Sequence, residues 1–297
     1  MKVTILGSGA MACLLGAHMA GKADLTLLGS WKAGIYAVHR DGIRCESASG
    51  RIARRVKAAA DPAECADSDL LIVAVKSHQT RRAAELARDT LKSGGLALTL
   101  QNGLGNVEIL REVFGPERVA GGIAILGAYM VAPGVVHQCG GEIRIQMQNH
   151  RHIAPVEELF HSAGFDVSII ENLESLQWGK LVVNSAINPL GALLRLTNEA
   201  FAERADAREA FLTVIRESAA VAAAAGIPLP YDNPEQYALE AARATAGNRC
   251  SMRQDLEKGR QTEIDAINGA VVRAADRAGV PAPWNRMLVQ LIRAAEL

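Results

Sequence analysis

The chain has 297 residues, of which 49% are apolar and 22% are charged, values that are typical of globular proteins and exclude an intrinsically disordered chain. This length is greater than one ordinary hydrophobic core requires, so two domains are expected. Lysine and arginine together number 32, as do aspartate and glutamate, which excludes binding to nucleic acid or to an anionic membrane through general charge attraction.

Two glycines near the N-terminus predict a dinucleotide-binding turn. The apolar strand Val3–Leu6 leads directly into Gly7, Ser8, Gly9, Ala10 and Met11, which open a helix. Gly7 permits the tight turn, Gly9 lets the backbone approach a pyrophosphate, and the helix N-terminus offers N–H groups to the anion. Ala12 replaces the third glycine of the usual fingerprint. Since this start has none of the features of a secretory signal, a cytoplasmic protein is expected.

The end of the second strand, expected at Asp24–Leu28, bears on the choice of cofactor. An acidic residue there would bind the ribose hydroxyls of NAD and repel a 2′-phosphate. The chain has Gly29, Ser30, Trp31 and Lys32 instead. This composition favours NADP, with Lys32 as the candidate partner of the 2′-phosphate; the alternative is that Lys32 is an ordinary surface lysine.

Further strands follow in the rhythm of an α/β fold. Ile43–Cys45 and Ile52–Val56 predict a hairpin across Ser-Ala-Ser-Gly, and Asp69–Val75 and Leu96–Leu100 predict buried strands. Lys76 comes directly after the strand at 69–75, and Asn102 comes two residues after the strand at 96–100. Because ligands of open α/β sheets bind beyond the carboxyl ends of the strands, both are candidate cofactor-binding residues.

After about residue 170 the pattern becomes helical. Helices are expected at Leu173–Leu194, Arg208–Ala225, Glu235–Thr245 and Thr262–Ala278. Thr262 and Asp265 are spaced like a capping box, which would place Glu263 in the first turn of the last of these helices. Pro189 is expected to end or kink the first of them. The sequence thus predicts an α/β fold, with a Rossmann-type dinucleotide-binding domain over 1–170 and an all-α domain over 171–297.

A candidate catalytic site is spread over two stretches of the helical half. Lys180, Asn184 and Asn188 follow each other at four-residue spacing, which places an ammonium group and two amides along one helix face among apolar neighbours. Buried polar groups need partners. Ser251 and Glu263, in the second stretch, are the residues expected to provide a hydroxyl and a carboxylate.

The motifs together resemble those of the ketopantoate reductases (2-dehydropantoate 2-reductases). They are the N-terminal GSGAM, VKSHQT at 75–80, LQNGLGN at 100–106, WGKLVVNSAINPL at 178–190 and SMRQDLEKGRQTEIDAINGA at 251–270. They occur in the family's order and spacing over essentially the whole chain, and the last block is far more specific than the glycine turn.

The resemblance implies roles for individual residues. By similarity, Lys180 is the catalytic lysine and Glu263 the substrate-binding carboxylate. Ser251 holds the substrate acid, and Asn184 and Asn188 are substrate amides. The resemblance also implies that Asn102 lies near the nicotinamide and Lys76 near a cofactor phosphate, and that the site lies in a cleft between the domains.

Two positions depart from the family pattern. Many members have an arginine after the second strand, where this chain has Ser30, so a preference for NADPH is less strongly implied. Arg253 stands where an apolar residue is expected, and it would either bind a second acidic group or face solvent.

The expected function is NADPH-dependent reduction of 2-dehydropantoate to (R)-pantoate, in the biosynthesis of pantothenate and coenzyme A. The alternatives are a related NAD(P)-dependent dehydrogenase of another branched or aromatic 2-oxo acid or D-2-hydroxy acid, and a dinucleotide-binding sensor without turnover. The expected partner is a small 2-oxo acid, with no nucleic acid, membrane or metal. If the protein assembles, a homodimer that forms through an alanine-rich helical face is expected. The five cysteines are scattered along the sequence, which favours free thiols in a reducing cytoplasm.

Overall fold

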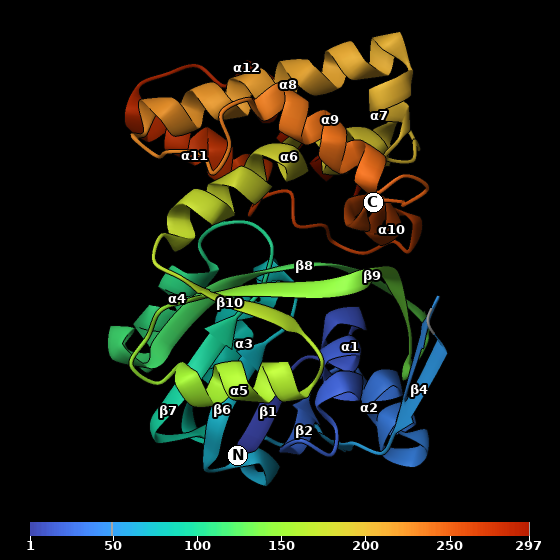
Figure 1. The fold of residues 1–297 in the computed structure, drawn as a ribbon, viewed down its shortest axis with the longest axis vertical. Coiled ribbons are helices and arrows are strands. Elements are labelled where there is room, and N and C mark those ends of the chain that lie inside the picture. Colours follow the sequence, from blue (N-terminus) through green and yellow to red (C-terminus); the bar gives the residue numbers. More distant parts are fainter. Residues whose placement is uncertain (49, 297) are drawn as a thin grey trace. The chain divides into compact units, whose positions relative to one another are not determined.

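The structure is a computed structural model that describes residues 1–48 and 50–296. By its internal contacts the chain divides into two compact units, Met1–Gln101 with Asn106–Leu173 and Asn102–Gly105 with Glu174–Leu297. The first contains the β-sheet and is called the sheet unit, and the second consists of helices and is called the helical unit (Figure 1). The predicted fold class, an α/β dinucleotide-binding fold followed by helices, is confirmed.

Within the described residues, ten strands form one sheet in the order β4-β3-β9-β8-β7-β6-β1-β2-β5, with β10 paired to β9. The strands are β1 (Lys2–Leu6), β2 (Asp24–Leu28), β3 (Ile43–Ser47), β4 (Gly50–Arg54), β5 (Lys57–Ala59), β6 (Ser68–Val73), β7 (Leu91–Thr99), β8 (Val119–Ala132), β9 (Val135–Gln148) and β10 (Asp166–Ile170). The run from β5 to β8 is parallel, and its strand order reverses between β1 and β6. Such a reversal is where parallel α/β sheets bind ligands.

The apolar runs of the sequence form the central strands. β1, β2 and β6 are buried along most of their length, as parallel strands covered on both faces must be. The predicted hairpin is also present, with Cys45 opposite Ile52, although its second strand ends at Arg54 rather than Val56. Part of the predicted turn, Ser49, lies outside the described residues.

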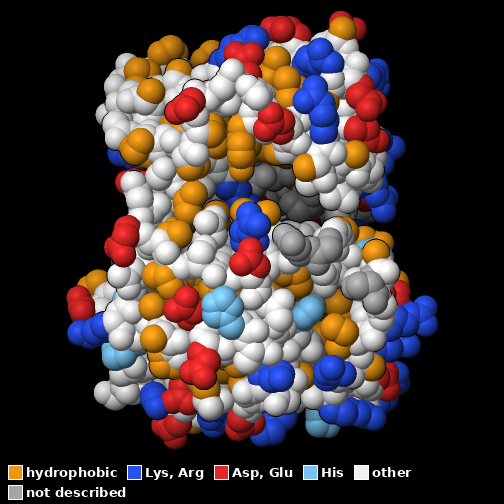
Figure 2. Space-filling view, in the orientation of Figure 1, with side chains coloured by type: hydrophobic (Ala, Val, Ile, Leu, Met, Phe, Trp, Pro, Cys, Tyr) orange, Lys and Arg blue, Asp and Glu red, His pale blue; other side chains and the backbone are white. Residues whose placement is uncertain are grey.

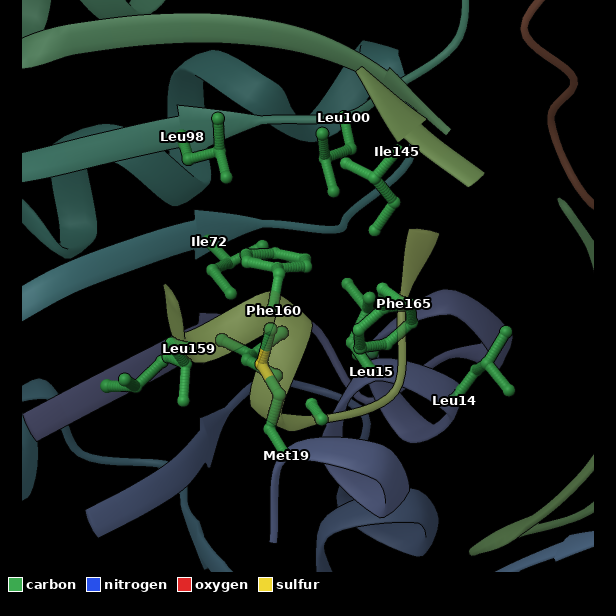
Figure 3. Packing of buried hydrophobic residues seen from close by; sticks show 14 of the residues in the cluster. Leu14, Leu15, Met19, Ile72, Leu98, Leu100, Ile145, Leu159, Phe160 and Phe165 are labelled. Carbon is green, nitrogen blue, oxygen red and sulfur yellow. The ribbon is translucent and has the colours of Figure 1, made fainter. Parts of the chain in front are cut away.

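Helices of the sheet unit cover the sheet and complete its core. They are α1 (Ala10–Met19), α2 (Lys32–Asp41), α3 (Thr80–Leu86), α4 (Asn106–Phe114) and α5 (Ala154–Ser162). Leu159 and Phe160 of α5, with Phe165 beyond it, pack toward α1 and the sheet (Figure 3). The rings of Phe160 and Phe165 are 5.3 Å apart between centroids.

The helical unit is built around a long helix, α6 (Leu173–Leu193), which is apolar on most of its surface. The others are α7 (Ala200–Glu203), α8 (Ala205–Ala224), α9 (Pro234–Ala244), α10 (Ser251–Glu257), α11 (Asn268–Ala278) and α12 (Pro283–Ala295). The predicted helices at 173–194, 208–225 and 235–245 correspond to α6, α8 and α9. The predicted helix at 262–278 is present as α11, but it begins only at Asn268. α7, α10 and α12 were not predicted.

Of the two predicted effects of the proline in α6, ending or kinking the helix, the first is wrong. Pro189 lies inside α6, which continues to Leu193. An interior proline removes one backbone hydrogen bond, so the helix must be supported at this point by contacts from elsewhere.

Charged side chains of both signs are intermingled over the face shown in Figure 2, as the balanced composition requires. Among residues 1–48 and 50–296, the helices are all too short or too polar to span a membrane.

Candidate active site

The three polar residues predicted to form a row all lie on α6. Lys180 and Asn184 are partly buried, and Asn188 is buried. The intervening residues Val182 and Ala186 are fully buried. Because side chains four residues apart lie on the same helix face, the amides and the ammonium group form one polar strip on an otherwise apolar helix.

Two opposing effects set the charge state of Lys180. Burial lowers its pKa to about 8, because the ammonium form loses hydration, whereas the negative charge of Glu263 raises it. Burial is the larger effect. The side chain is therefore mostly protonated at neutral pH but gives up its proton far more readily than a surface lysine.

The sequence predicted that Glu263 lies in the first turn of a helix, and this prediction is wrong. Glu263 is buried in a turn that precedes α11, and its backbone carbonyl accepts the N–H groups of Ala266 and Ile267. The capping box is also wrong, because the Thr262 hydroxyl donates to Glu296 at 2.5 Å. Asp265 instead pairs with Arg293. The turn holds the Glu263 carboxylate within the electrostatic range of Lys180.

The block that contains Ser251 packs against the second half of α6. Ser251 is the first residue of α10, and the Cys250 thiol before it donates to the Asn188 carbonyl at 3.2 Å. A Cβ placed on Gly191 would come within 3.1 Å of the same sulfur. Glycine at 191 thus permits this close approach, and the two stretches that the sequence predicted to meet lie side by side. Cys250 was not among the predicted site residues.

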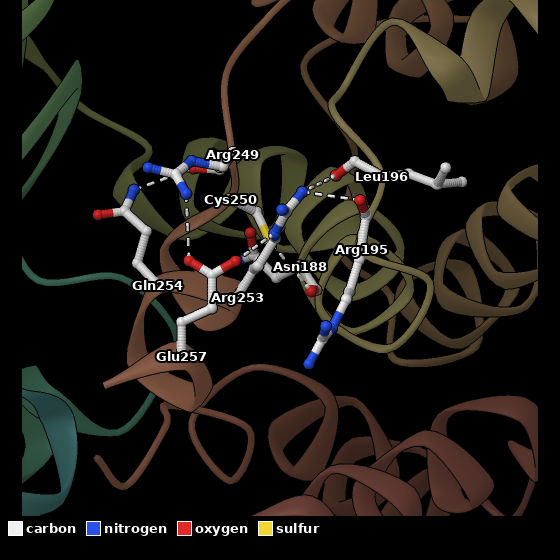
Figure 4. A network of polar contacts seen from close by, with 8 residues as sticks. All are labelled: Asn188, Arg195, Leu196, Arg249, Cys250, Arg253, Gln254 and Glu257. Atoms are coloured by element: carbon white, nitrogen blue, oxygen red, sulfur yellow. Dashed lines mark hydrogen bonds and ion pairs between the residues drawn. The ribbon is translucent and has the colours of Figure 1, made fainter. Parts of the chain in front are cut away.

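Of the two roles expected for Arg253, facing solvent is wrong, because the side chain is mostly buried and pairs with an acidic group of the chain itself. Its guanidinium pairs with Glu257 at 2.8 Å and donates to the Arg195 carbonyl at 2.7 Å (Figure 4). Arg195 has a positive φ of 54°, a conformation that a non-glycine residue adopts only with support. Arg253 therefore stabilises the segment of chain that follows α6.

A segment between α8 and α9 packs against α6 beside the lysine. The Tyr231 hydroxyl donates to the Gly179 carbonyl at 2.9 Å. A Cβ on Gly179 would lie 2.6 Å from the Pro230 ring. Glycine at position 179 is thus required for this contact. The sequence analysis did not predict this role, although Gly179 lies within the motif at 178–190.

Asn102 belongs by its contacts to the helical unit, although it follows a strand of the sheet. Two residues later, the Leu104 N–H donates to the Ala266 carbonyl at 2.9 Å. A Cβ on Gly103 would lie 2.4 Å from the same oxygen. The loop with Asn102 is therefore packed against the turn that carries Glu263.

In the sheet unit, the N-terminal glycine turn fits a dinucleotide. Gly7 has a φ of +121°, and a Cβ there would lie 3.0 Å from the Ala74 carbonyl oxygen. A Cβ on Gly9 would meet no atom of the described chain within 4 Å, so the space beside it is open. α1 begins at Ala10 without a side-chain cap. These are the features that a pyrophosphate at a helix N-terminus requires. Ser8 is buried within the glycine turn, and Met11 lies in the first turn of α1.

The residues after β2 line a surface pocket. Lys32 is exposed at the start of α2, next to Ser30. The lining consists of Gly29, Ser30, Lys32, Ile35, Tyr36, His39, Ala58 and Ala60. The pocket thus offers cationic and apolar side chains, and the contact between Lys32 and a 2′-phosphate stays a prediction.

Lys76, after β6, is partly buried and precedes a short 3₁₀ helix, Ser77–Gln79. A polar network supports this loop. The Gln101 amide donates to the Val75 carbonyl and to the Thr80 hydroxyl, each at 2.8 Å. Gln101 thus ties the loop after β6 to the loop after β7, and its place before Asn102 was the only sequence signal for this role.

Comparison with known proteins gives one consistent result. The sequence model described as "Ketopantoate reductase PanE/ApbA" matches residues 3–152, and that of its C-terminal part matches residues 172–296. The 2-dehydropantoate 2-reductase of Halobacterium salinarum is 35% identical over 100% of this chain and 99% of its own.

Solved structures agree with this result. A ketopantoate reductase from Ralstonia eutropha superposes with a TM-score of 0.92 at 32% identity, covering 100% of this chain and 98% of that one. D-Mandelate dehydrogenase, solved with NADH and anilino(oxo)acetate, gives a TM-score of 0.93 over 100% of this chain and 98% of its own. Its identity of 24% establishes likeness of fold alone.

Proposed function

Because the chain belongs to the ketopantoate reductase family, we propose that it reduces 2-dehydropantoate to (R)-pantoate with NADPH, on the path to pantothenate and coenzyme A. It is an oxidoreductase that acts on a CH–OH group and uses a nicotinamide cofactor. The observation that carries the substrate proposal is the polar strip of Lys180, Asn184 and Asn188, with the Glu263 charge acting on the lysine.

The sheet unit would hold the cofactor through its backbone and cations. Gly7 to Met11 would receive the pyrophosphate at the α1 N-terminus, with Lys32 and Lys76 as candidate phosphate contacts and Asn102 as the candidate nicotinamide contact. When bound, the nicotinamide supplies the hydride that reduces the substrate carbonyl carbon.

The helical unit would supply the proton and hold the oxo acid. Negative charge develops on the carbonyl oxygen during reduction, and the Lys180 ammonium group stabilises this charge and then donates its proton. Ser251 would donate to the substrate carboxylate. Glu263 would accept a substrate hydroxyl, and the amides of Asn184 and Asn188 would hold the remaining polar atoms of the acid.

The compartment and the assembly belong to the same proposal. All five cysteines carry free thiols, and four of them are buried, which supports a reducing cytoplasm. A homodimer remains a prediction; on α8, Ala220, Ala223 and Ala224 are exposed and form the alanine-rich face that would serve it.

The cofactor preference follows from the residues after β2. Since no carboxylate is present to repel a 2′-phosphate, we expect a higher kcat/KM with NADPH than with NADH. Lys32→Glu should weaken NADPH selectively, by repulsion. Steady-state kinetics with both cofactors measure this. A several-fold preference for NADH in the wild type would contradict the proposal, and equal losses with both cofactors in the variant would assign Lys32 to the surface.

Ser251→Ala tests substrate binding separately from turnover. Removing a hydrogen bond to a charged group costs roughly 1.5–3 kcal/mol, so KM for the oxo acid should rise while kcat changes little. Ser162→Ala, in the sheet unit, serves as the matched serine control. If the Ser251 variant keeps the wild-type KM, the substrate carboxylate binds elsewhere.

A second candidate function rests on Ser30. The family resemblance implies an arginine at this position, and without it the pocket after β2 does not demand NADP. A dehydrogenase of another branched or aromatic 2-oxo acid that uses NAD is the alternative. A panel of 2-dehydropantoate, 2-oxoisovalerate and benzoylformate, each assayed with NADPH and NADH, distinguishes the two functions by kcat/KM.

A further inference from the structure

The proline in α6 leaves one backbone carbonyl without its helical partner. In an α-helix, the N–H of residue 189 would donate to the carbonyl of residue 185, and proline has no N–H. The Ser185 carbonyl lies between Asn184 and Asn188 in the chain. Because Ser185 is fully buried, water cannot replace the missing donor without a cavity.

A side chain from α11 takes the place of that donor. The Asn268 amide nitrogen donates to the Ser185 carbonyl at 2.7 Å, across 83 residues of sequence. The same nitrogen donates to the Asn285 side-chain oxygen at 2.9 Å. Both asparagines are 0% exposed. Asn268 therefore uses both of its amide hydrogens, and one of them replaces the helical hydrogen bond to Ser185 that Pro189 cannot make.

The orientation of both amides is determined by a carboxylate on α8. Glu217 accepts the Asn285 amide at 2.8 Å, and it also accepts the backbone N–H groups of Trp284 and Asn285 at the start of α12. An ionised carboxylate only accepts hydrogen bonds, so the Asn285 nitrogen must face Glu217 and its oxygen must face Asn268. The Asn268 nitrogen must then face Ser185, and its oxygen, which is buried, has no hydrogen-bond partner among the described residues.

The α6 side of this arrangement is equally constrained. The Ser185 hydroxyl lies 2.8 Å from the Ser218 hydroxyl of α8, and Ser218 also accepts the Asn285 amide at 3.0 Å. Four helices, α6, α8, α11 and α12, thus meet at the proline through side chains that are buried or half-buried. An arrangement with so many fixed donors permits few alternative positions of the helix.

We propose that Asn268 is a positioning residue for the substrate-binding amides of Asn184 and Asn188. By replacing the hydrogen bond that Pro189 cannot make, it keeps this segment of α6 in the orientation that substrate binding requires. This inference rests on the proposed function, in which those amides bind the oxo acid. Asn268 itself contacts the helix backbone and has no part in the proton transfer.

The test is a double-mutant cycle between positions 268 and 189. Asn268→Leu keeps the approximate volume but removes both donors. A misplacement of substrate-binding groups by less than 1 Å is enough to weaken binding, so KM for the oxo acid should rise about tenfold or more, with a smaller change in kcat. Pro189→Ala restores the backbone N–H. In that background, Asn268→Leu should change KM by no more than about twofold, because the helix then supplies its own donor.

Two controls separate positioning from general stability. Asn233→Ala removes the side-chain cap of α9 in the same unit and should lower the melting temperature without raising KM. NADPH affinity should be unchanged in every variant, because the glycine turn lies in the sheet unit.

The outcomes distinguish this inference from the proposed function. If the wild type does not reduce 2-dehydropantoate, the proposed function fails, and the cycle is then run with the oxo acid that the substrate panel identifies. If Asn268→Leu only lowers the melting temperature, or raises KM equally with and without Pro189→Ala, Asn268 is not a positioning residue. If the single variant does not fold, the comparison of Pro189→Ala with the double variant still decides: a double variant that also fails to fold overturns the inference.

Discussion

Lys180→Ala should lower kcat by about 10²–10⁴-fold, the usual contribution of a positioned acid–base group. The variant loses both the positive charge beside the developing oxyanion and the proton that neutralises it. NADPH binding should survive, because the glycine turn belongs to the sheet unit. Steady-state kinetics measure the first effect, and titration of cofactor fluorescence measures the second.

Arginine at the same position separates charge from proton donation. Lys180→Arg keeps a cation but does not release a proton at any working pH, so it should rescue kcat poorly. Lys22→Ala, at an exposed position of the sheet unit, is the matched control and should behave as the wild type. Near-normal turnover with arginine would make Lys180 an electrostatic group only. Near-normal turnover with alanine would remove it from the mechanism.

The pH dependence of reduction should report the environment of Lys180. Burial lowers its pKa to about 8, and reduction needs the protonated form, so kcat/KM should fall as the pH rises through about 8. Glu263→Gln removes the charge that raises this pKa. An opposite charge nearby shifts a pKa by about 1–3 units, so the alkaline limb should move to lower pH by at least about one unit, with reduced turnover at neutral pH.

The isosteric glutamine keeps an acceptor for a substrate hydroxyl, so the movement of the limb isolates the electrostatic effect. Glu240→Gln, on the exposed face of α9, is the matched control and should leave the profile in place. An alkaline limb that stays at its wild-type position in Glu263→Gln would show that another group sets the pKa of Lys180. A wild-type profile without a limb near pH 8 would show that the proton comes from elsewhere.

Local patterns in the sequence were enough for the elements whose apolar residues carry a regular period. Continuous apolar runs predicted β1, β2 and β6, and the helical period predicted α6, α8 and α9. The long strands β8 and β9, of 14 residues each, were not predicted. Glycines interrupt both strands and weaken a strand signal, and their pairing depends on contacts between residues far apart in sequence. α12 did carry a signal, because Pro283 opens it and Leu288 and Ile292 lie on its buried face.

The turn at 262–267 shows why the capping box failed. The spacing of Thr262 and Asp265 suits a helix start, but both side chains have stronger partners in α12 and beyond, Glu296 and Arg293. Charged and hydroxyl groups near a helix end bond to whichever partner the fold brings close. The sequence could identify Glu263 as a candidate, but not the turn that holds its carboxylate.

By itself, the sequence determined which residues were available for chemistry and that Lys180, Asn184 and Asn188 share a helix face, because helix geometry depends only on neighbours along the chain. The tertiary structure decided their environment. Burial lowers the pKa of Lys180, and the charge of Glu263, 83 residues away in the sequence, partly offsets this effect. The α6 helix continues past Pro189 because Asn268, also distant in sequence, donates to the Ser185 carbonyl. Desolvation and buried hydrogen bonds depend on which distant segments pack together, and no local pattern encodes that.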